Sequence, residues 1–133
     1  MIAVDSSALI AILEREPDAS HFADEIRKAN RLLISAVNAH EAAIVLRIRR
    51  GANALARFWR FLQIENDFEI VPFDEAQARE AVAAFERYGK GINSETRLNL
   101  ADCAAYALAK TMNVPLQFKG DDFVRTDLHF VGR

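Results

Sequence analysis

The sequence predicts an α/β fold in which a small parallel β-sheet has α-helices on both faces. Short apolar runs that suit buried strands alternate with longer segments whose apolar residues recur at helical spacing. A strand followed each time by a helix is typical of a parallel sheet, because the helix carries the chain back to the start of the next strand. The 133 residues, 51% of them hydrophobic, are enough for one core, so we expect a single domain over residues 1–133.

The predicted strands are short apolar runs that end at turns or at helix starts. The first, Ile2-Ala3-Val4, ends at Asp5, and the second, residues 31–35 (RLLIS), leads into a helical pattern. The third covers residues 68–73 (FEIVPF). Two further runs are expected to form a fourth strand over residues 115–118 and a fifth over residues 128–131.

The predicted helices begin at residues that suit a helix N-terminus, and each continues with apolar residues on one side. The third is expected to end before Gly51, and the fourth covers residues 52–64. The segment Gly89-Lys90-Gly91 ends the fifth helix and opens a flexible loop. The expected caps or first residues are, in order, Ser6 or Ser7, Pro17-Asp18, Ser35 or Asn38, Ala52, Asp74 and Asn99.

The composition excludes several classes of protein. No apolar run is long enough to span a bilayer, and the first residues, MIAVDSSALIAILERE, lack the basic opening of a signal peptide. The single Cys103 cannot form an internal disulfide, so we expect a cytoplasmic protein without membrane contact. The formal net charge of −2 is evidence against a general nucleic-acid coat, and an RNA-binding protein with this balance must group its basic residues.

Carboxylates are expected near the carboxyl ends of the strands, where an open parallel sheet binds its ligands. Asp5 follows the first strand, and Asp121 and Asp122 follow the fourth. Glu41 lies in the helix after the second strand, and Asp102 in the first turn of its own helix. Converging carboxylates repel one another unless a cation compensates, and Mg²⁺ prefers oxygen ligands. These positions therefore predict a divalent-metal site suited to phosphate chemistry.

Each acid also has an ordinary structural explanation. Asp102 and Asp122 suit helix N-termini, where the dipole favours negative charge, and Glu41 suits a surface ion pair with Arg47. Asp5 is harder to explain in this way, because apolar residues flank it on both sides and a shielded carboxylate needs partners. The joint placement of the acids favours the metal site.

Six motifs, in a fixed order, span almost the whole chain. They are residues 4–9 (VDSSAL), 35–42 (SAVNAHEA), 88–91 (YGKG), 98–103 (LNLADC), 118–123 (FKGDDF) and 126–127 (TD). Each is weak alone, but together they resemble the VapC-type toxins of the PIN-domain ribonuclease family, the ribonuclease half of bacterial toxin–antitoxin pairs. The resemblance implies a PIN fold and an endoribonuclease that uses Mg²⁺, with Mn²⁺ able to substitute, to cleave a structured RNA such as tRNA or rRNA.

The resemblance also implies roles for the acids. Asp5, Glu41 and Asp102 correspond to the first three acids of the family, and the fourth is Asp122 or, alternatively, Asp121. Asp5 and Asp102 are expected to bind the metal directly.

Two departures from the family concern the surface that faces the substrate. Residues 92–95 (INSE) stand where relatives often carry basic residues, and Ala101 stands where many have glycine. Near the acidic site, Lys90, Arg97 and Lys119 are candidate contacts to RNA phosphates, which fix position without reading sequence.

The resemblance implies a VapB-type antitoxin as a partner, because an uncontrolled ribonuclease would harm its host. An antitoxin segment is expected to pack in a groove of the early helices around Leu9, Leu13 and residues 42–46. It should direct a basic side chain at Asp5 and Asp102, whose charge that side chain can neutralise. We also expect a homodimer formed through the later helices.

Two other functions are alternatives. One is another magnesium-dependent phosphoryl-transfer enzyme, but a phosphatase of the haloacid-dehalogenase type needs a second Asp where Ser7 stands. A receiver domain needs an acidic pair near the first strand, where the chain offers only Asp5. The other alternative is a catalytically silent PIN-fold binding module, against which the complete set of acids argues.

Overall fold

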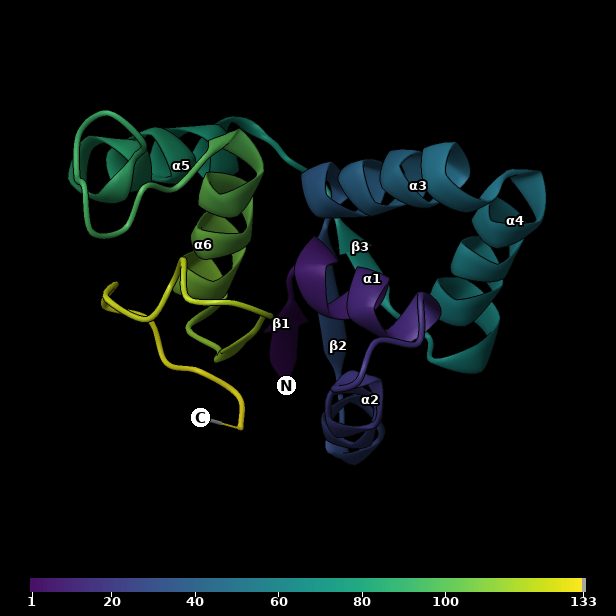
Figure 1. Cartoon of the computed structure of the whole chain (residues 1–133). Helices are drawn as coiled ribbons and strands as arrows, with labels where there is room; N and C mark the ends of the chain where they lie inside the picture. The colour runs from purple at the N-terminus through teal and green to yellow at the C-terminus, as the bar shows by residue number, and fades with distance from the viewer. Residues whose placement is uncertain (133) are drawn as a thin grey trace.

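The computed structural model describes residues 1–132, and at its centre is a sheet of four parallel strands (Figure 1). The strands are β1 (Ile2–Val4), β2 (Leu32–Ser35), β3 (Glu69–Val71) and β4 (Leu116–Gln117). Their order is β3-β2-β1-β4, so β2 and β4 pair with opposite sides of β1. The carboxyl end of β1 is therefore a topological switch point, the place where open α/β sheets bind ligands.

Helices cover both faces of the sheet, which confirms the predicted fold class. They are α1 (Ser6–Leu13), α2 (Ala19–Lys28), α3 (Ala36–Arg50), α4 (Ala52–Arg60), the π-helical segment η1 (Phe61–Glu65), α5 (Glu75–Tyr88) and α6 (Leu100–Met112). The segments α1 to η1 share an apolar core with one face of the sheet, and α5 and α6 share a second core with the other face (Figure 1).

Alternate residues of the central strands supply the two cores. Val4 and Ile34 belong to the first core, and Ala3 and Leu33 belong to the second. Each is at most 1% exposed. Neighbouring residues of a strand face opposite sides of a sheet, so these continuously apolar strands are buried on both. Strand β1 therefore fixes the position of Asp5, the residue that directly follows it.

Asp5, and neither Ser6 nor Ser7, caps α1. It is extended, with φ −80° and ψ 154°, and its carboxylate accepts a hydrogen bond from the backbone N–H of Ser7 at 3.1 Å. Both serines therefore lie within the helix, which corrects the predicted cap. The caps predicted for α5 and α6, Asp74 and Asn99, are confirmed, since each side chain accepts a backbone hydrogen bond.

One other prediction about the elements is wrong, and one is confirmed only in part. Residues 128–131 do not form a fifth strand among the described residues. They contribute only a parallel bridge between Phe130 and Leu116, because β4 is two residues long and offers little edge for pairing. The helix expected over residues 52–64 changes to π-helical geometry after α4, and Leu62 stays fully buried there.

The groove expected for an antitoxin around the early helices is contradicted at three of its residues, whereas Ile44 in the same range is 44% exposed. Leu9, Ala42 and Leu46 are 0%, 0% and 1% exposed. All three belong to the core that α1 and α3 share with the sheet, so they cannot line an open surface groove.

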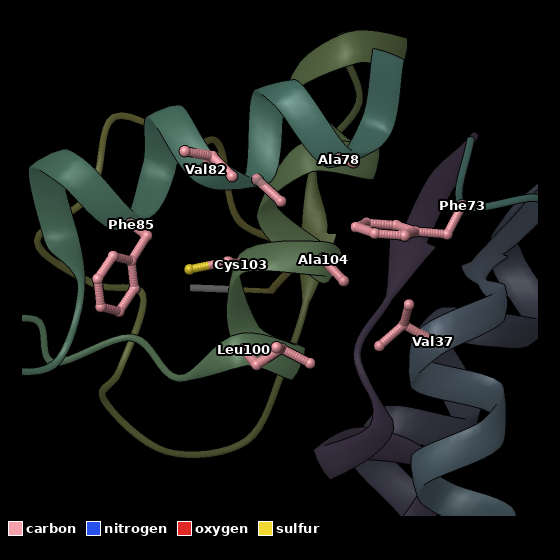
Figure 2. A pocket seen from close by; sticks show the side chains of 9 residues that line it. Val37, Phe73, Ala78, Val82, Phe85, Leu100, Cys103 and Ala104 are labelled. Carbon is pink, nitrogen blue, oxygen red and sulfur yellow. The ribbon is translucent and has the colours of Figure 1, made fainter. Parts of the chain in front are cut away.

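The later helices carry an open apolar pocket instead, with a volume of about 330 Å³ (Figure 2). Val82 and Phe85 of α5 and Leu100 and Cys103 of α6 line it, and Phe73 closes one side. Leu100 is 81% exposed, which is unusual for a large apolar side chain.

None of the helices among residues 1–132 is long and apolar enough to cross a membrane.

Candidate active site

The Asp5 carboxylate is buried at the carboxyl end of β1, with 4% of the residue exposed. Its Oδ2 atom accepts hydrogen bonds from the Ser7 hydroxyl at 2.6 Å and from the Ser7 backbone N–H. Burial raises the pKa of Asp5 to about 6, the hydrogen bonds from Ser7 oppose this, and the charge of Glu41 adds to it. Asp5 is thus a shielded acid beside another acid, as the sequence predicts.

Asp102 occupies the third position of α6, where a capping box holds it. Its backbone N–H donates to the Asn99 side chain at 2.8 Å, and its Oδ2 accepts from the Asn99 backbone N–H at 3.0 Å. Burial raises the pKa of Asp102 to about 7, although the bond from Asn99 lowers it. The charges of Asp5, Asp122 and Glu41 raise it further, so the acids from four segments share one electrostatic environment.

Glu41 lies in the second turn of α3 and is half-buried. The hydroxyl of Ser6, a buried residue of α1, donates a short hydrogen bond to Glu41 Oε1. This bond directs the Glu41 carboxylate toward the first turn of α1, next to Asp5. It occupies one acceptor position of the carboxylate and leaves the other positions to a bound molecule.

This set of acids fits a magnesium ion held by few protein ligands. Within residues 1–132, no three Asp, Glu, His or Cys side chains form a ready-made ligand group. Mg²⁺ commonly keeps several waters and binds through one or two carboxylates, so it does not require such a group. The raised pKa values of Asp5 and Asp102 mark carboxylates whose charge is poorly compensated, which a divalent cation would correct.

Asn38 is a residue of this site for which the sequence predicts only a possible role as the cap of α3. Ser35 caps α3, and the Asn38 side chain, 0% exposed, instead contacts Asp5 and the carbonyl of Ala101. One signal was available in the sequence. Asn38 lies three residues after Ser35 and four before Ala42, so it falls on the inner face of the helix.

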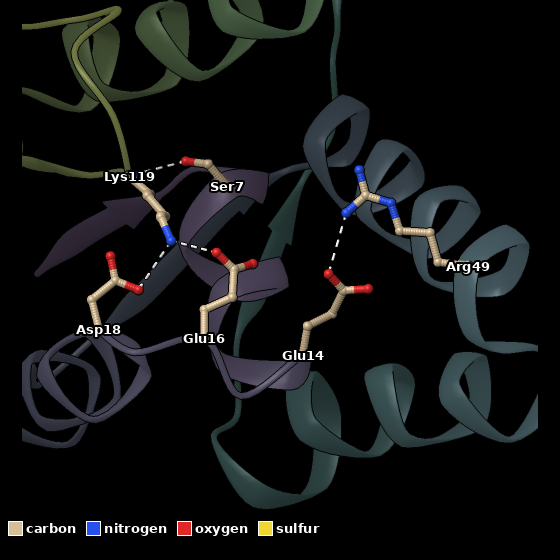
Figure 3. A network of polar contacts seen from close by, with 6 residues as sticks. All are labelled: Ser7, Glu14, Glu16, Asp18, Arg49 and Lys119. Atoms are coloured by element: carbon tan, nitrogen blue, oxygen red, sulfur yellow. Dashed lines mark hydrogen bonds and ion pairs between the residues drawn. The ribbon is translucent and has the colours of Figure 1, made fainter.

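The candidate RNA contact Lys119 is held by two acids of the loop between α1 and α2 (Figure 3). Its ammonium group pairs closely with Glu16 and, at 3.2 Å, with Asp18. Its backbone N–H donates to the Ser7 hydroxyl at 2.9 Å, and that hydroxyl donates to Asp5. Lys119 therefore ties the segment after β4 to the Asp5 carboxylate.

A second anchor holds the chain beyond Asp122. Asp127 accepts hydrogen bonds from the Tyr106 hydroxyl at 2.6 Å and from the Lys110 ammonium at 2.7 Å, both on α6. Burial opposes ionisation, but the bonds from Lys110 and Tyr106 lower the pKa of Asp127 to about 2. The segment that carries Asp122 is thus fixed at both ends.

The other two candidate RNA contacts remain accessible. Lys90 and Arg97 are exposed in the loop between α5 and α6, whose ends meet in a bridge between Gly89 and Leu98. Both are exposed cations, as a contact to a phosphate of the RNA backbone requires.

We expect Lys119 to act as a clamp and not as a phosphate contact. The variants Lys119→Met and Glu16→Gln/Asp18→Asn should lower the melting temperature by similar small amounts, because each breaks the same ion pairs. Neither should change the salt dependence of RNA binding, measured by fluorescence anisotropy between 50 and about 200 mM salt. A slope reduced by about one in Lys119→Met, together with tighter RNA binding by the double variant, would show a phosphate contact.

The chain is similar to known proteins over nearly its whole length. The sequence profile of the PIN domain matches residues 2–128. Ribonuclease VapC28 of Mycobacterium tuberculosis is 41% identical over 123 residues, which cover 92% of this chain and 92% of that protein.

Solved structures share the fold. The M. tuberculosis toxin VapC20, described as cleaving the sarcin-ricin loop, matches with a TM-score of 0.81 at 14% identity, over 98% of each chain. A chain of a toxin–antitoxin complex from Klebsiella pneumoniae matches with a TM-score of 0.73 at 18% identity, over 96% of this chain and 93% of that one.

Proposed function

The chain belongs to the PIN-domain family as a VapC-type toxin, and from this premise we propose that it is a magnesium-dependent endoribonuclease of a VapBC-type toxin–antitoxin system. One observation carries the proposal: the buried Asp5 follows β1 at the topological switch point of the sheet, and the charges of Asp5, Asp122 and Glu41 all raise the pKa of Asp102. The charge of Asp122 contributes to the raised pKa of Asp102, which favours it over Asp121 as the fourth acid.

The residues of the site would divide the work between metal binding and proton transfer. Asp5 and Asp102 would hold the Mg²⁺ ion, or Mn²⁺ in its place. When bound, the ion supplies positive charge that stabilises the reacting phosphate and lowers the pKa of a water. Glu41, held by Ser6, would orient that water and accept its proton, and Asp122 would help to orient it.

The substrate we propose is a structured RNA such as tRNA or rRNA. Lys90 and Arg97 would contact its phosphates from the exposed loop, so the backbone is held without reading the sequence. The similarity to VapC ribonucleases and to a toxin that cleaves the sarcin-ricin loop supports this class of substrate.

Removal of the metal tests the proposed activity. The purified protein should cleave a pool of tRNA and rRNA in Mg²⁺ or Mn²⁺, lose the activity in EDTA, and regain it when the metal is restored. Gel analysis of the products would measure the cleavage. Cleavage that persists in EDTA would contradict the proposal. Hydrolysis of small phosphomonoesters without RNA cleavage would favour a phosphatase, and the absence of both activities would favour a silent binding module.

A VapB-type antitoxin is the partner we propose. Among the structural relatives are toxin–antitoxin complexes, in which this fold is one component. Burial and the neighbouring acids leave the negative charges of Asp5 and Asp102 poorly compensated. An arginine or lysine of the antitoxin would form ion pairs with these carboxylates. Such a side chain would occupy the place of the metal and so block the site.

We further propose a homodimer through the apolar pocket between α5 and α6. Val82 is 59% exposed at this pocket, and Leu100 is 81% exposed, so a second copy would remove a contiguous apolar surface from water.

Val82→Asp is expected to convert a dimer to a monomer in sedimentation velocity, with the circular dichroism unchanged. Ile64→Asp, at an exposed apolar residue of η1, is the matched control. A monomeric wild-type protein, or equal effects of both variants, would contradict the dimer.

A further inference from the structure

The carboxamide of Asn38 lies between the Asp5 side chain and the first turn of α6. Its Nδ2 is 3.0 Å from the carbonyl oxygen of Ala101, in the first turn of α6, and 3.5 Å from Asp5 Oδ1. Both neighbours can only accept hydrogen bonds, so the amide nitrogen must face them. Asn38 Oδ1 consequently points away from both and has no hydrogen-bond partner among the described residues.

The two oxygens of Asp5 are held by different elements. Oδ2 accepts from the hydroxyl and the backbone N–H of Ser7 in α1, whereas Oδ1 faces the Asn38 amide of α3. Donors on both oxygens fix the plane of the carboxylate. Each oxygen has more than one acceptor direction, so the arrangement still leaves room for a cation.

We infer that Asn38 is a positioning residue that fixes the Asp5 carboxylate relative to the first turn of α6, and thereby relative to Asp102. Ala101, whose carbonyl Asn38 contacts, directly precedes Asp102 in the chain. One amide therefore contacts both of the segments that carry the proposed metal ligands. The inference rests on the proposed metal site, because fixing the two acids matters only if they act together.

The unpaired side-chain oxygen of Asn38 argues that the residue positions Asp5 and does not serve packing alone. A buried acceptor without a partner lowers stability, so the amide is a poor choice if packing is its only purpose. Leucine has a similar shape without polar atoms, and it removes both the unpaired oxygen and the two contacts. Asn38→Leu should therefore keep a stable fold and lose the alignment of the acids.

The test compares Asn38 with a second buried amide that has the same defect. Gln117 is 1% exposed, donates to the carbonyl of Phe22 in α2 at 3.0 Å, and also has an unpaired side-chain oxygen. Gln117→Leu thus changes the same number of buried polar groups without touching the acids. Asn38→Ser is the conservative variant, since its hydroxyl can still donate one hydrogen bond.

The full chain of each variant would be titrated with Mn²⁺ in a calorimeter, melted, and assayed on RNA. Asn38→Leu is expected to lose about 10- to 100-fold in Mn²⁺ affinity and in kcat, as removal of an orienting partner does at metal sites, with KM for RNA unchanged. Asn38→Ser should lie between this variant and the wild type. Gln117→Leu should keep the wild-type affinity, and its melting temperature should resemble that of Asn38→Leu.

Three results would overturn the inference. The first is a Mn²⁺ affinity of Asn38→Leu equal to that of Gln117→Leu. The second is a loss of Mn²⁺ affinity in Asn38→Leu that accompanies a lower melting temperature. This loss would have to disappear when Asn38→Leu and the wild type are both measured well below the melting temperature of the variant. The third applies if Asn38→Leu does not fold: a folded Asn38→Ser with wild-type affinity and kcat would then exclude a positioning role. A wild-type protein that does not bind Mn²⁺ would instead contradict the proposed function.

Discussion

Asp5→Asn is expected to lower kcat for RNA cleavage by about 1,000-fold or more and to stabilise the metal-free protein at neutral pH. A metal ion contributes several kcal/mol to transition-state stabilisation, and each 1.36 kcal/mol corresponds to about a factor of ten in rate. Asn has nearly the same shape as Asp, and its one side-chain oxygen can still accept the two hydrogen bonds of Ser7, although its amide nitrogen would then face Nδ2 of Asn38. The loss of activity should therefore not come from a loss of fold.

The stabilisation follows from the sign of the pKa shift. The folded-state pKa of Asp5, about 6, lies above its ordinary value of 3.8, so the folded protein binds the proton more tightly than the unfolded chain. The free energy of unfolding of the wild type must then fall as the pH rises through this interval. Above pH 6 the shift corresponds to about 3 kcal/mol as an upper limit, and Asp5→Asn would recover the part that is not offset by its amide nitrogen facing Nδ2 of Asn38.

Urea unfolding at pH 7.5 and 4.5 and a fluorogenic RNA assay at pH 7.5 would measure both effects. The stability gain of Asp5→Asn should be largest at pH 7.5 and mostly lost at pH 4.5. Asp24→Asn, at an exposed acid of α2 paired with Arg27, is the control and should change neither property. A folded Asp5→Asn protein that cleaves RNA at the wild-type rate would refute the assignment of Asp5.

The carboxylates could be predicted because local pattern and sheet topology determine their positions. Asp5 directly follows an apolar strand, and Asn99 and Asp102 form a capping box within four residues of sequence. Parallel strands bring such ends to one edge, which needs no knowledge of individual side-chain contacts. The expectation that the acids lie at one edge of the sheet could be derived from the sequence for this reason.

Contacts between segments far apart in the chain could not be predicted in this way. Asn38 contacts Ala101, 63 residues later, and Lys119 pairs with Glu16, 103 residues earlier. Neither partner leaves a local signature. The burial of Leu9, which was expected to line an antitoxin groove, could not be predicted for a related reason: α1 is apolar almost all round, so its sequence (SSALIAIL) does not show that the side bearing Leu9 packs against α3.

Glu41→Gln is expected to separate metal binding from turnover. Glu41 Oε1 accepts the hydrogen bond of Ser6, and the carboxylate keeps further acceptor positions, one of which is enough to take up a proton. The amide of Gln cannot take up a proton at neutral pH. We therefore expect kcat to fall by about 100- to 10,000-fold, the contribution of a general base, while the Mn²⁺ affinity falls much less.

Calorimetry with Mn²⁺ and single-turnover RNA cleavage would measure the two properties of Glu41→Gln on the same preparation. Ser6→Ala is the companion variant, because it keeps the Glu41 carboxylate and removes only the hydroxyl that directs it. It should lose less kcat than Glu41→Gln and bind Mn²⁺ as the wild type does. If Glu41→Gln binds no Mn²⁺ while its fold is intact, Glu41 is itself a metal ligand. The proton would then have to leave through Asp122 or through solvent, and the proposed division between the acids would be wrong.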